Sequence, residues 1–160
     1  MENFEVINPT RIIFGKNQLD RLPQLLSEVG VKNVLLVYGG GSVKRIGLFS
    51  KVMEKLSEAN PEYATLIKAV EIARENNIDF ILALGGGSVI DGVKFISGAI
   101  NYQGDAWDVL ERKEGCVFTS AIPFGTILTL PATGSEANSG AVISRSELKL
   151  KMTMGGPLFF

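Results

Sequence analysis

Hydrophobic positions along the chain predict alternating strands and helices. Two nearly continuous apolar runs, at residues 33–38 and 78–84, have the length and composition of strands that are buried on both faces. Around them, apolar residues recur at helical spacing in the segments 18–29, 43–57, 60–73 and 89–100. This alternation is typical of an α/β fold, a Rossmann-like parallel sheet with helices on both faces.

Each of the two strands runs directly into three glycines and a serine, at 39–42 and 85–88. Glycine lets a ligand approach the backbone closely, and Ser88 is expected to cap the next helix, whose free N–H groups favour a phosphate. Asp91 follows one turn later, where it is expected to accept a hydrogen bond from a ribose or an amide. A single turn of this kind is equally well explained as a tight βα connection. Two of them, at the same edge of a parallel sheet, predict one binding site.

The residues after the first glycine turn indicate which dinucleotide is bound. The Gly-x-Gly-x-x-Gly fingerprint and its acidic partner about 20 residues later are both absent in that form. Ser42, Lys44 and Arg45 stand there instead, and a hydroxyl with two cations favours a 2′-phosphate, hence NADP(H). The alternative interpretation is that Lys44 and Arg45 form the solvated face of a helix.

The helical patterns at 43–57 and 60–73 follow each other almost directly. Asn60 is the expected N-cap of the second helix and Pro61 its first residue. An alternating chain usually has a strand between two such helices. Either the helices meet directly, or a segment is missing between 59 and 61, and we favour the second interpretation.

The two ends of the chain give weaker signals. Apolar residues at 4–14 flank a turn-like Asn-Pro-Thr and predict two short strands or a hairpin, paired within the sheet or with a second subunit. Residues 101–116 are expected to form a surface loop anchored by Trp107 and Leu110. After strand-forming residues at 119–132, the segment 133–136 is either a polar turn along a ligand or an ordinary structural turn, which is the commoner case for such a short motif. Residues 142–143 are read as the start of a strand, and 144–151 as a charged linker.

Composition excludes several classes of function. The chain has 160 residues, 46% hydrophobic and 21% charged, which is typical of one globular domain, here 1–160. A net charge of −1 gives no general attraction to nucleic acid, and neither a signal peptide nor a membrane-spanning run is recognisable. One cysteine and no histidine exclude an internal disulfide and imidazole-based sites, and they suit a cytoplasmic protein.

Five motifs together resemble the iron-containing, group III metal-dependent alcohol dehydrogenases. They are NPTRIIFG at 8–15, YGGGSVKRIG at 38–47, LALGGGSVIDGVKF at 82–95, YQGDAWD at 102–108 and ILTLPATGSEANSGAVIS at 127–144. The branch they resemble most is the NADPH-dependent butanol dehydrogenase or aldehyde reductase type. The resemblance covers the N-terminal half of that family, a dehydroquinate synthase-like domain, and lacks its helical C-terminal metal-binding domain.

The resemblance implies a set of cofactor contacts. The first turn would surround the adenosine ribose and its 2′-phosphate, the second would bind the pyrophosphate and the nicotinamide side, and a third segment would line the nicotinamide. The implied residues are Gly39, Gly40, Gly41, Ser42 and Lys44 for the first, Gly86, Gly87, Ser88 and Asp91 for the second, and Thr129, Leu130 and Thr133 for the third. In the family, hydride passes between nicotinamide and a short alcohol or aldehyde held by Fe²⁺ or Zn²⁺.

No catalytic or metal-binding residue is expected in this chain, because the family's ligands, an Asp and three His, lie in the C-terminal half. The chain is therefore predicted to be the cofactor-binding half of an NADP(H)-dependent oxidoreductase, inactive alone, and the family suggests a homodimer through the N-terminal strands. Two alternatives remain. The chain is a non-catalytic dinucleotide-binding or dimerising fragment, or it is a relative of glycerol dehydrogenase or dehydroquinate synthase.

Overall fold

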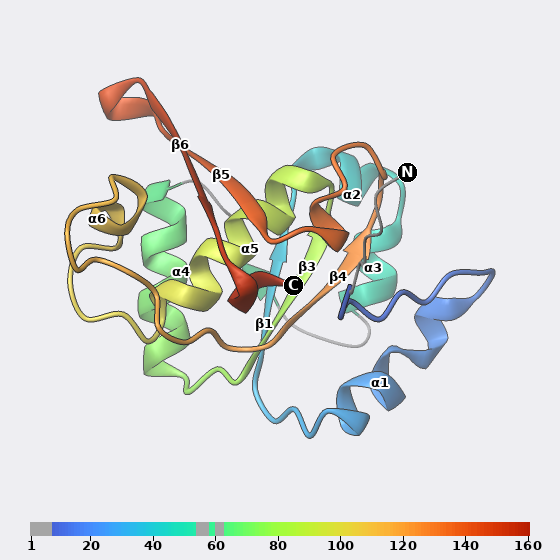
Figure 1. Cartoon of the computed structure of the whole chain (residues 1–160). Helices are drawn as coiled ribbons and strands as arrows, with labels where there is room; N and C mark the ends of the chain where they lie inside the picture. Colours follow the sequence, from blue (N-terminus) through green and yellow to red (C-terminus); the bar gives the residue numbers. More distant parts are fainter. Residues whose placement is uncertain (1–7, 54–57, 60–62) are drawn as a thin grey trace, which may run out of the picture.

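The computed structural model describes residues 8–53, 58–59 and 63–160, and its centre is a parallel sheet (Figure 1). The strands are β1 (Val34–Tyr38), β2 (Glu58–Ala59), β3 (Phe80–Gly85) and β4 (Phe124–Leu128). They lie in the order β2-β1-β3-β4, and every neighbouring pair is parallel. The predicted α/β class is confirmed, and the two apolar runs are the central strands β1 and β3.

The sheet is covered on both faces, as the apolar runs predict. Successive side chains of a strand point to opposite faces, so Leu35 and Val37 of β1 belong to one buried cluster and Leu36 and Tyr38 to another. The first cluster contains residues of α4 (Tyr63–Glu75) and α5 (Gly87–Ala99), and the second contains residues of α1 (Leu22–Glu28), α2 (Gly41–Arg45) and α3 (Leu48–Met53). The sheet therefore lies between two hydrophobic cores, one on each of its faces.

The helices follow the predicted segments with two local differences. The first begins as a 3-10 turn, η1 (Gln18–Arg21), before α1, and Gly30 follows α1 with a φ of +71°. The expected helix at 43–57 is divided into α2 and α3, since Gly47 has a φ of +70°, which a continuous α-helix cannot include. The end of that helix, Asn60 and Pro61 lie outside the described residues.

A two-residue strand, β2, lies between α3 and α4, where the hydrophobic pattern of the sequence predicts no strand. β2 contains two residues, and it pairs with β1 only at Leu36↔Glu58 and Val37↔Ala59. The helices α3 and α4 are therefore not joined directly, because the chain passes along the edge of the sheet between them. A two-residue strand is short even for an edge position.

The segment predicted as a charged linker is part of a β-hairpin, so that prediction is wrong. β5 (Gly140–Arg145) pairs antiparallel with β6 (Leu150–Gly155), and the turn between them contains the 3-10 helix η3 (Ser146–Leu148). Leu150, Met152 and Met154 alternate with polar residues, the period of a half-buried strand, and the two methionines pack against the core of α4 and α5. The high charge of the segment concealed this alternation.

The hairpin packs on α5 and not on the sheet. Figure 1 shows α5 between the β5–β6 hairpin and the central strands. Ala141 and Ile143 of β5 are buried, and residues 89–99 of α5 are all buried. A helix enclosed in this way must be apolar nearly all round, which makes its two charged residues, Asp91 and Lys94, the exceptions to explain.

Outside these elements, one expectation falls partly outside the described residues and one is confirmed. Residues 8–14, the described part of the expected N-terminal strands, form no strand, and residues 4–7 lie outside the described part. Trp107 and Leu110 are 2% and 0% exposed and anchor the loop at 101–116 through a short helix, α6 (Ala106–Leu110). Among the described residues, no helix has the length and hydrophobicity needed to cross a membrane.

Candidate functional site

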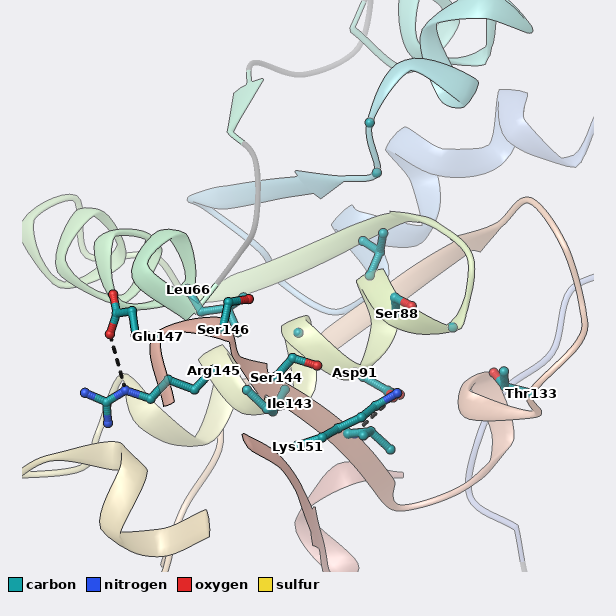
Figure 2. Close-up of a pocket in the computed structure, with 16 residues that line it drawn as sticks. Leu66, Ser88, Asp91, Thr133, Ile143, Ser144, Arg145, Ser146, Glu147 and Lys151 are labelled. Atoms are coloured by element: carbon teal, nitrogen blue, oxygen red, sulfur yellow. Dashed lines mark hydrogen bonds and ion pairs between the residues drawn. The ribbon is translucent and has the colours of Figure 1, made fainter. Parts of the chain in front are cut away.

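The two glycine turns lie side by side at the carboxyl ends of β1 and β3. The N–H of Gly39 donates to the carbonyl of Leu84 at 3.1 Å, which joins the start of the first turn to the end of β3. Gly39, Gly40, Gly87 and Ser88 line one cavity of about 660 Å³ (Figure 2). The sequence-based prediction that both turns arrive at one site agrees with this geometry.

The second turn leads into α5 through Gly86, which is the N-cap in place of the expected Ser88. Its backbone is extended, with φ −94° and ψ −169°, and its carbonyl accepts the N–H groups of Val89 and Ile90. Ser88 lies within the first turn of the helix and its side chain is exposed. A β-carbon on Gly86 would meet no atom within 4 Å, so open space lies in front of the free N–H groups of the helix.

Gly87 is in contact with the segment that follows β4. A β-carbon at Gly87 would lie 2.2 Å from Oγ1 of Thr133 and 3.2 Å from Oγ of Ser135. These two hydroxyls share a hydrogen bond of 2.8 Å, and Gly134 between them has a φ of +68°. Glycine at position 87 is therefore required by the close approach of the 133–136 segment, which brings Thr133 to the cavity. Contact of Thr133 with a cofactor stays a prediction.

Asp91 lines the middle of the cavity and uses one of its two oxygens. The side chain is 9% exposed, and Oδ2 accepts the N–H of Val142 at 3.0 Å. Oδ1 is buried and has no partner among the described residues. A buried acceptor without a donor costs free energy, and a hydroxyl group of a ligand in this cavity is able to supply the missing bond.

Lys94, one turn beyond Asp91, was missed by the sequence analysis. It is fully buried, and its Nζ donates to Asn138 O at 2.6 Å, to Asn138 Oδ1 at 3.1 Å and to Gly140 O at 2.8 Å. Burial lowers the pKa of the ammonium group, an effect that the nearby carboxylates of Asp91 and Glu136 oppose. The available signal was a lysine between Val93 and Phe95 in a helix that is otherwise largely apolar.

This pKa predicts how stability changes at alkaline pH. Between the lowered folded pKa and the ordinary value of 10.5, the unfolded chain binds more protons at Lys94, so its contribution to the free energy of unfolding rises with pH. The difference in that free energy between the wild type and Lys94→Met should therefore shift in favour of the wild type as pH approaches 10.5. Urea denaturation across that range measures it, and a difference that stays constant would contradict the assignment.

Of the other predicted residues, Gly41, Lys44, Gly86, Thr129 and Leu130 do not line the cavity, and the side chain of Ser42 lies outside the described part of the structure. The Nζ of Lys44 lies over the rings of Tyr38 and Phe49, 5.4 Å and 5.1 Å from their centroids. Thr129 donates its N–H to Gly85 O at 3.0 Å, and Leu130 is 65% exposed.

The β5–β6 hairpin provides a polar wall that the sequence analysis did not expect. Figure 2 shows Ser88 and Thr133 at one end of the cavity, Asp91 in the middle, and Ser144 to Glu147 at the other end. Lys151 of β6 also lines the cavity. Arg145 lies 5.2 Å from the ring centre of Trp107, and its Nε is 3.6 Å from Glu147. The charge of segment 144–151 predicts a linker, and for this reason these residues were not expected at the site.

Comparison with known proteins identifies the family. The family model described as iron-containing alcohol dehydrogenase matches residues 9–160. The chain belongs to this family. The resemblance stated from the five motifs is thereby confirmed, and the enclosed α5, the two glycine turns and the hairpin are features of an iron-containing alcohol dehydrogenase.

Two curated relatives cover nearly the whole chain. The probable NADH-dependent butanol dehydrogenase 1 of Bacillus subtilis is 51% identical over 172 residues, which span 100% of this chain and 44% of the relative. The NADPH-dependent aldehyde reductase YqhD of Escherichia coli is 47% identical over 157 residues, 91% of this chain and 40% of the relative. The chain thus spans less than half the length of these relatives.

A solved structure agrees with the fold. The NADH-dependent butanol dehydrogenase A of Thermotoga maritima superposes with a TM-score of 0.91 at 32% identity, over 100% of this chain and 43% of that chain. The matched relatives are named for NADH as well as for NADPH. The names of these relatives therefore leave the choice between NADH and NADPH open.

The residues of the site fit a dinucleotide, and they do not fit the iron for which the family is named. The open space at Gly86 and the unpartnered Oδ1 of Asp91 suit the phosphates and hydroxyls of a dinucleotide. An iron site does not fit, since the described residues contain no group of three or more His, Cys, Asp or Glu side chains arranged to hold a metal, and the sequence has no histidine.

Proposed function

We propose that the chain is the cofactor-binding part of an NADP(H)-dependent alcohol dehydrogenase that acts on a short-chain alcohol or aldehyde such as butanol or butanal. The observation that carries the proposal is the single cavity that joins both glycine turns with Asp91. When bound there, the nicotinamide would supply or accept the hydride. The chain's own residues would bind and orient it, and turnover would require the remainder of a longer, metal-binding protein.

Within this cavity we assign the phosphates to the second turn and the start of α5. The N–H groups at the helix start and the helix dipole favour a negative group at Gly86, Gly87 and Ser88. Asp91 would accept a ribose hydroxyl through Oδ1, because a carboxylate repels a phosphate and needs a donor. Thr129, Leu130 and Thr133 would lie along the nicotinamide half.

The proposed preference for NADP(H) rests on the charges of the first turn. Segment 39–45 contains no carboxylate and two cations. Arg45 folds back on this turn, since its Nη1 lies 2.9 Å from where a β-carbon on Gly41 would be. Lys44 lies over the rings of Tyr38 and Phe49 at the base of the turn. The positive charges of Lys44 and Arg45 would favour a 2′-phosphate beside Ser42.

A separate proposal concerns the two-residue strand β2. We propose that a segment is missing between 59 and 61 relative to other members of the family. The alignment with the Bacillus subtilis relative supports this, because it spans 172 positions whereas the chain has 160 residues.

A dimer through the N-terminal segment is also proposed, and the side chains of Ile12 and Phe14, 68% and 98% exposed, support it. We further propose a cytoplasmic location.

Calorimetric titration of the 160-residue chain with NADPH and with NADH tests the proposed function. NADPH should bind more tightly, and Ser42→Asp should narrow the difference by about tenfold, or 1.4 kcal/mol, because a carboxylate repels the 2′-phosphate. Ser50→Asp, which adds the same charge on the exposed side of α3, is the matched control. NADPH at about a hundredfold over its Kd should raise the free energy of unfolding by about 2.7 kcal/mol.

Two outcomes would contradict the proposal. If NADH binds as tightly as NADPH and Ser42→Asp changes neither, the preference for the 2′-phosphate is wrong. If neither nucleotide binds at millimolar concentration, the cavity is not a cofactor site in this chain, and the alternative of a non-catalytic, dimerising fragment replaces the proposal.

A further inference from the structure

Lys94 is a buried charge that the proposed ligand does not explain, because it does not line the cavity. An ammonium group has three protons to donate, and here each goes to an uncharged oxygen, two of Asn138 and one of Gly140. Moving such a charge out of water is costly unless every donor is satisfied. The residue is therefore placed for its three bonds and not for packing alone.

Lys94 and Asp91 together bind one edge of β5. Asp91 accepts the N–H of Val142, and Lys94 donates to the carbonyl of Gly140, two residues earlier. Backbone groups two residues apart face the same edge of a strand. Side chains of α5 thus take the place of a third strand on this edge, while β6 pairs with the other edge.

The same three bonds fix the end of the segment that borders the glycine turn. Residues 133–140, called here the β4–β5 loop, begin with Thr133 against Gly87 and end with Asn138 and Gly140 on Lys94. Asn138 is oriented further by its Oδ1, which also accepts the N–H of Gly140 at 2.9 Å. Both contacts are made to α5, so the loop is held against this helix at each end.

We propose that Lys94 is a positioning residue, which holds the β4–β5 loop so that Thr133 borders the nucleotide cavity at the correct distance from the second glycine turn. This inference rests on the proposed function for its consequence in binding. Its structural part, the ordering of the loop by one ammonium group, does not depend on any ligand.

The surroundings of the three acceptors separate this role from ordinary stabilisation. Asn138 and Gly140 are exposed residues, so water can reach their oxygens when the ammonium group is removed. The cost to global stability should therefore be modest. The loop, in contrast, would lose the bonds that fix its end, so a smaller fraction of molecules would hold Thr133 in place. Nucleotide affinity falls in proportion to that fraction.

Three variants of the 160-residue chain separate these effects. Lys94→Met keeps the length of the side chain and removes its donors. Lys68→Met makes the same change on the exposed side of α4. Ala73→Gly lowers stability in the buried part of α4 without touching the loop. Each variant is compared with the wild type by thermal unfolding, by titration with NADPH, and by NMR hydrogen exchange.

Two backbone amides report on the loop. The N–H of Ala137 donates to Gly134 O at 3.0 Å within the loop, and the N–H of Val142 donates to Asp91. In Lys94→Met both should exchange faster, whereas the N–H of Ile81 in β3, bonded to Pro123 O, should not. The Kd for NADPH should rise by about tenfold, as expected if the competent fraction falls to about a tenth. Lys68→Met and Ala73→Gly should bind like the wild type.

If the amides of Ala137 and Val142 exchange at unchanged rates in Lys94→Met, the inference is overturned, whatever the Kd for NADPH is. A Kd that changes equally in Ala73→Gly also overturns it, since the effect would then follow global stability. If the wild type binds no nucleotide while Lys94→Met still loosens the loop, the proposed function fails and the ordering role of Lys94 stands.

Discussion

Replacing Gly87 with alanine is expected to displace the β4–β5 loop and abolish most of the nucleotide binding. The added methyl group would lie 2.2 Å from Oγ1 of Thr133 and 3.2 Å from Oγ of Ser135, so the hydrogen bond between these hydroxyls cannot survive unchanged. Overpacking of this kind costs about 1–3 kcal/mol. The Kd for NADPH should rise by at least about tenfold, because the wall of the cavity moves.

Gly86→Ala, one residue earlier, is the matched control for the effect on stability, and its binding tests the position assigned to the phosphate. The new methyl group meets no atom within 4 Å, and the φ of −94° is allowed for alanine. Alanine is a poorer N-cap than glycine, and this offsets its smaller entropy in the unfolded chain, so stability should change by less than about 0.5 kcal/mol. Binding should still weaken, because the methyl group occupies the space assigned to a phosphate. Normal binding by Gly86→Ala would place the phosphate elsewhere.

Phe118→Ala is expected to have the largest effect on stability. Phe118 is 6% exposed and makes edge contacts with the rings of Phe95, Tyr102 and Phe159, with centroids 6.0, 5.5 and 6.2 Å apart. It therefore joins α5 to the last residues of the described chain. Removal of a buried phenyl ring costs about 3–5 kcal/mol, a large part of the roughly 5–15 kcal/mol that stabilises a domain.

Urea denaturation of Phe118→Ala and of Val117→Ala measures this effect with its neighbour as the control. Val117 is 59% exposed, and its truncation should change the free energy of unfolding by less than about 0.5 kcal/mol. Equal losses in the two variants would show that the aromatic cluster does not hold the C-terminal residues to α5.

The central sheet was predictable because its signal is local. The runs at 33–38 and 78–84 are apolar at every position that faces either core, and no other element has this pattern together with a glycine turn. The division of one expected helix at Gly47 was not predictable in the same way. Glycine is tolerated in helices, and only the packed structure decides whether it adopts a positive φ.

Part of the cavity lining was predictable for a similar reason, while cofactor binding by these residues stays a prediction. The expected residues that line the cavity are Gly39, Gly40, Gly87, Ser88, Asp91 and Thr133. These residues come from turns that the sheet topology brings together. Lys151 and Arg145 were missed because they reach the cavity through the pairing of β5 with β6, a long-range contact that leaves only an alternation of apolar residues in the sequence.

The enclosure of α5 makes the hairpin part of the same core as the central strands, since Ile143 of β5 belongs to the cluster that contains residues of β1, β3, α4 and α5. In the folded chain the ammonium group of Lys94 has exchanged water for two oxygens of Asn138 and one of Gly140. Separation of the hairpin from α5 would return water to this charge and release the end of the β4–β5 loop. The wall of the cavity is therefore expected to depend on how firmly the hairpin is docked.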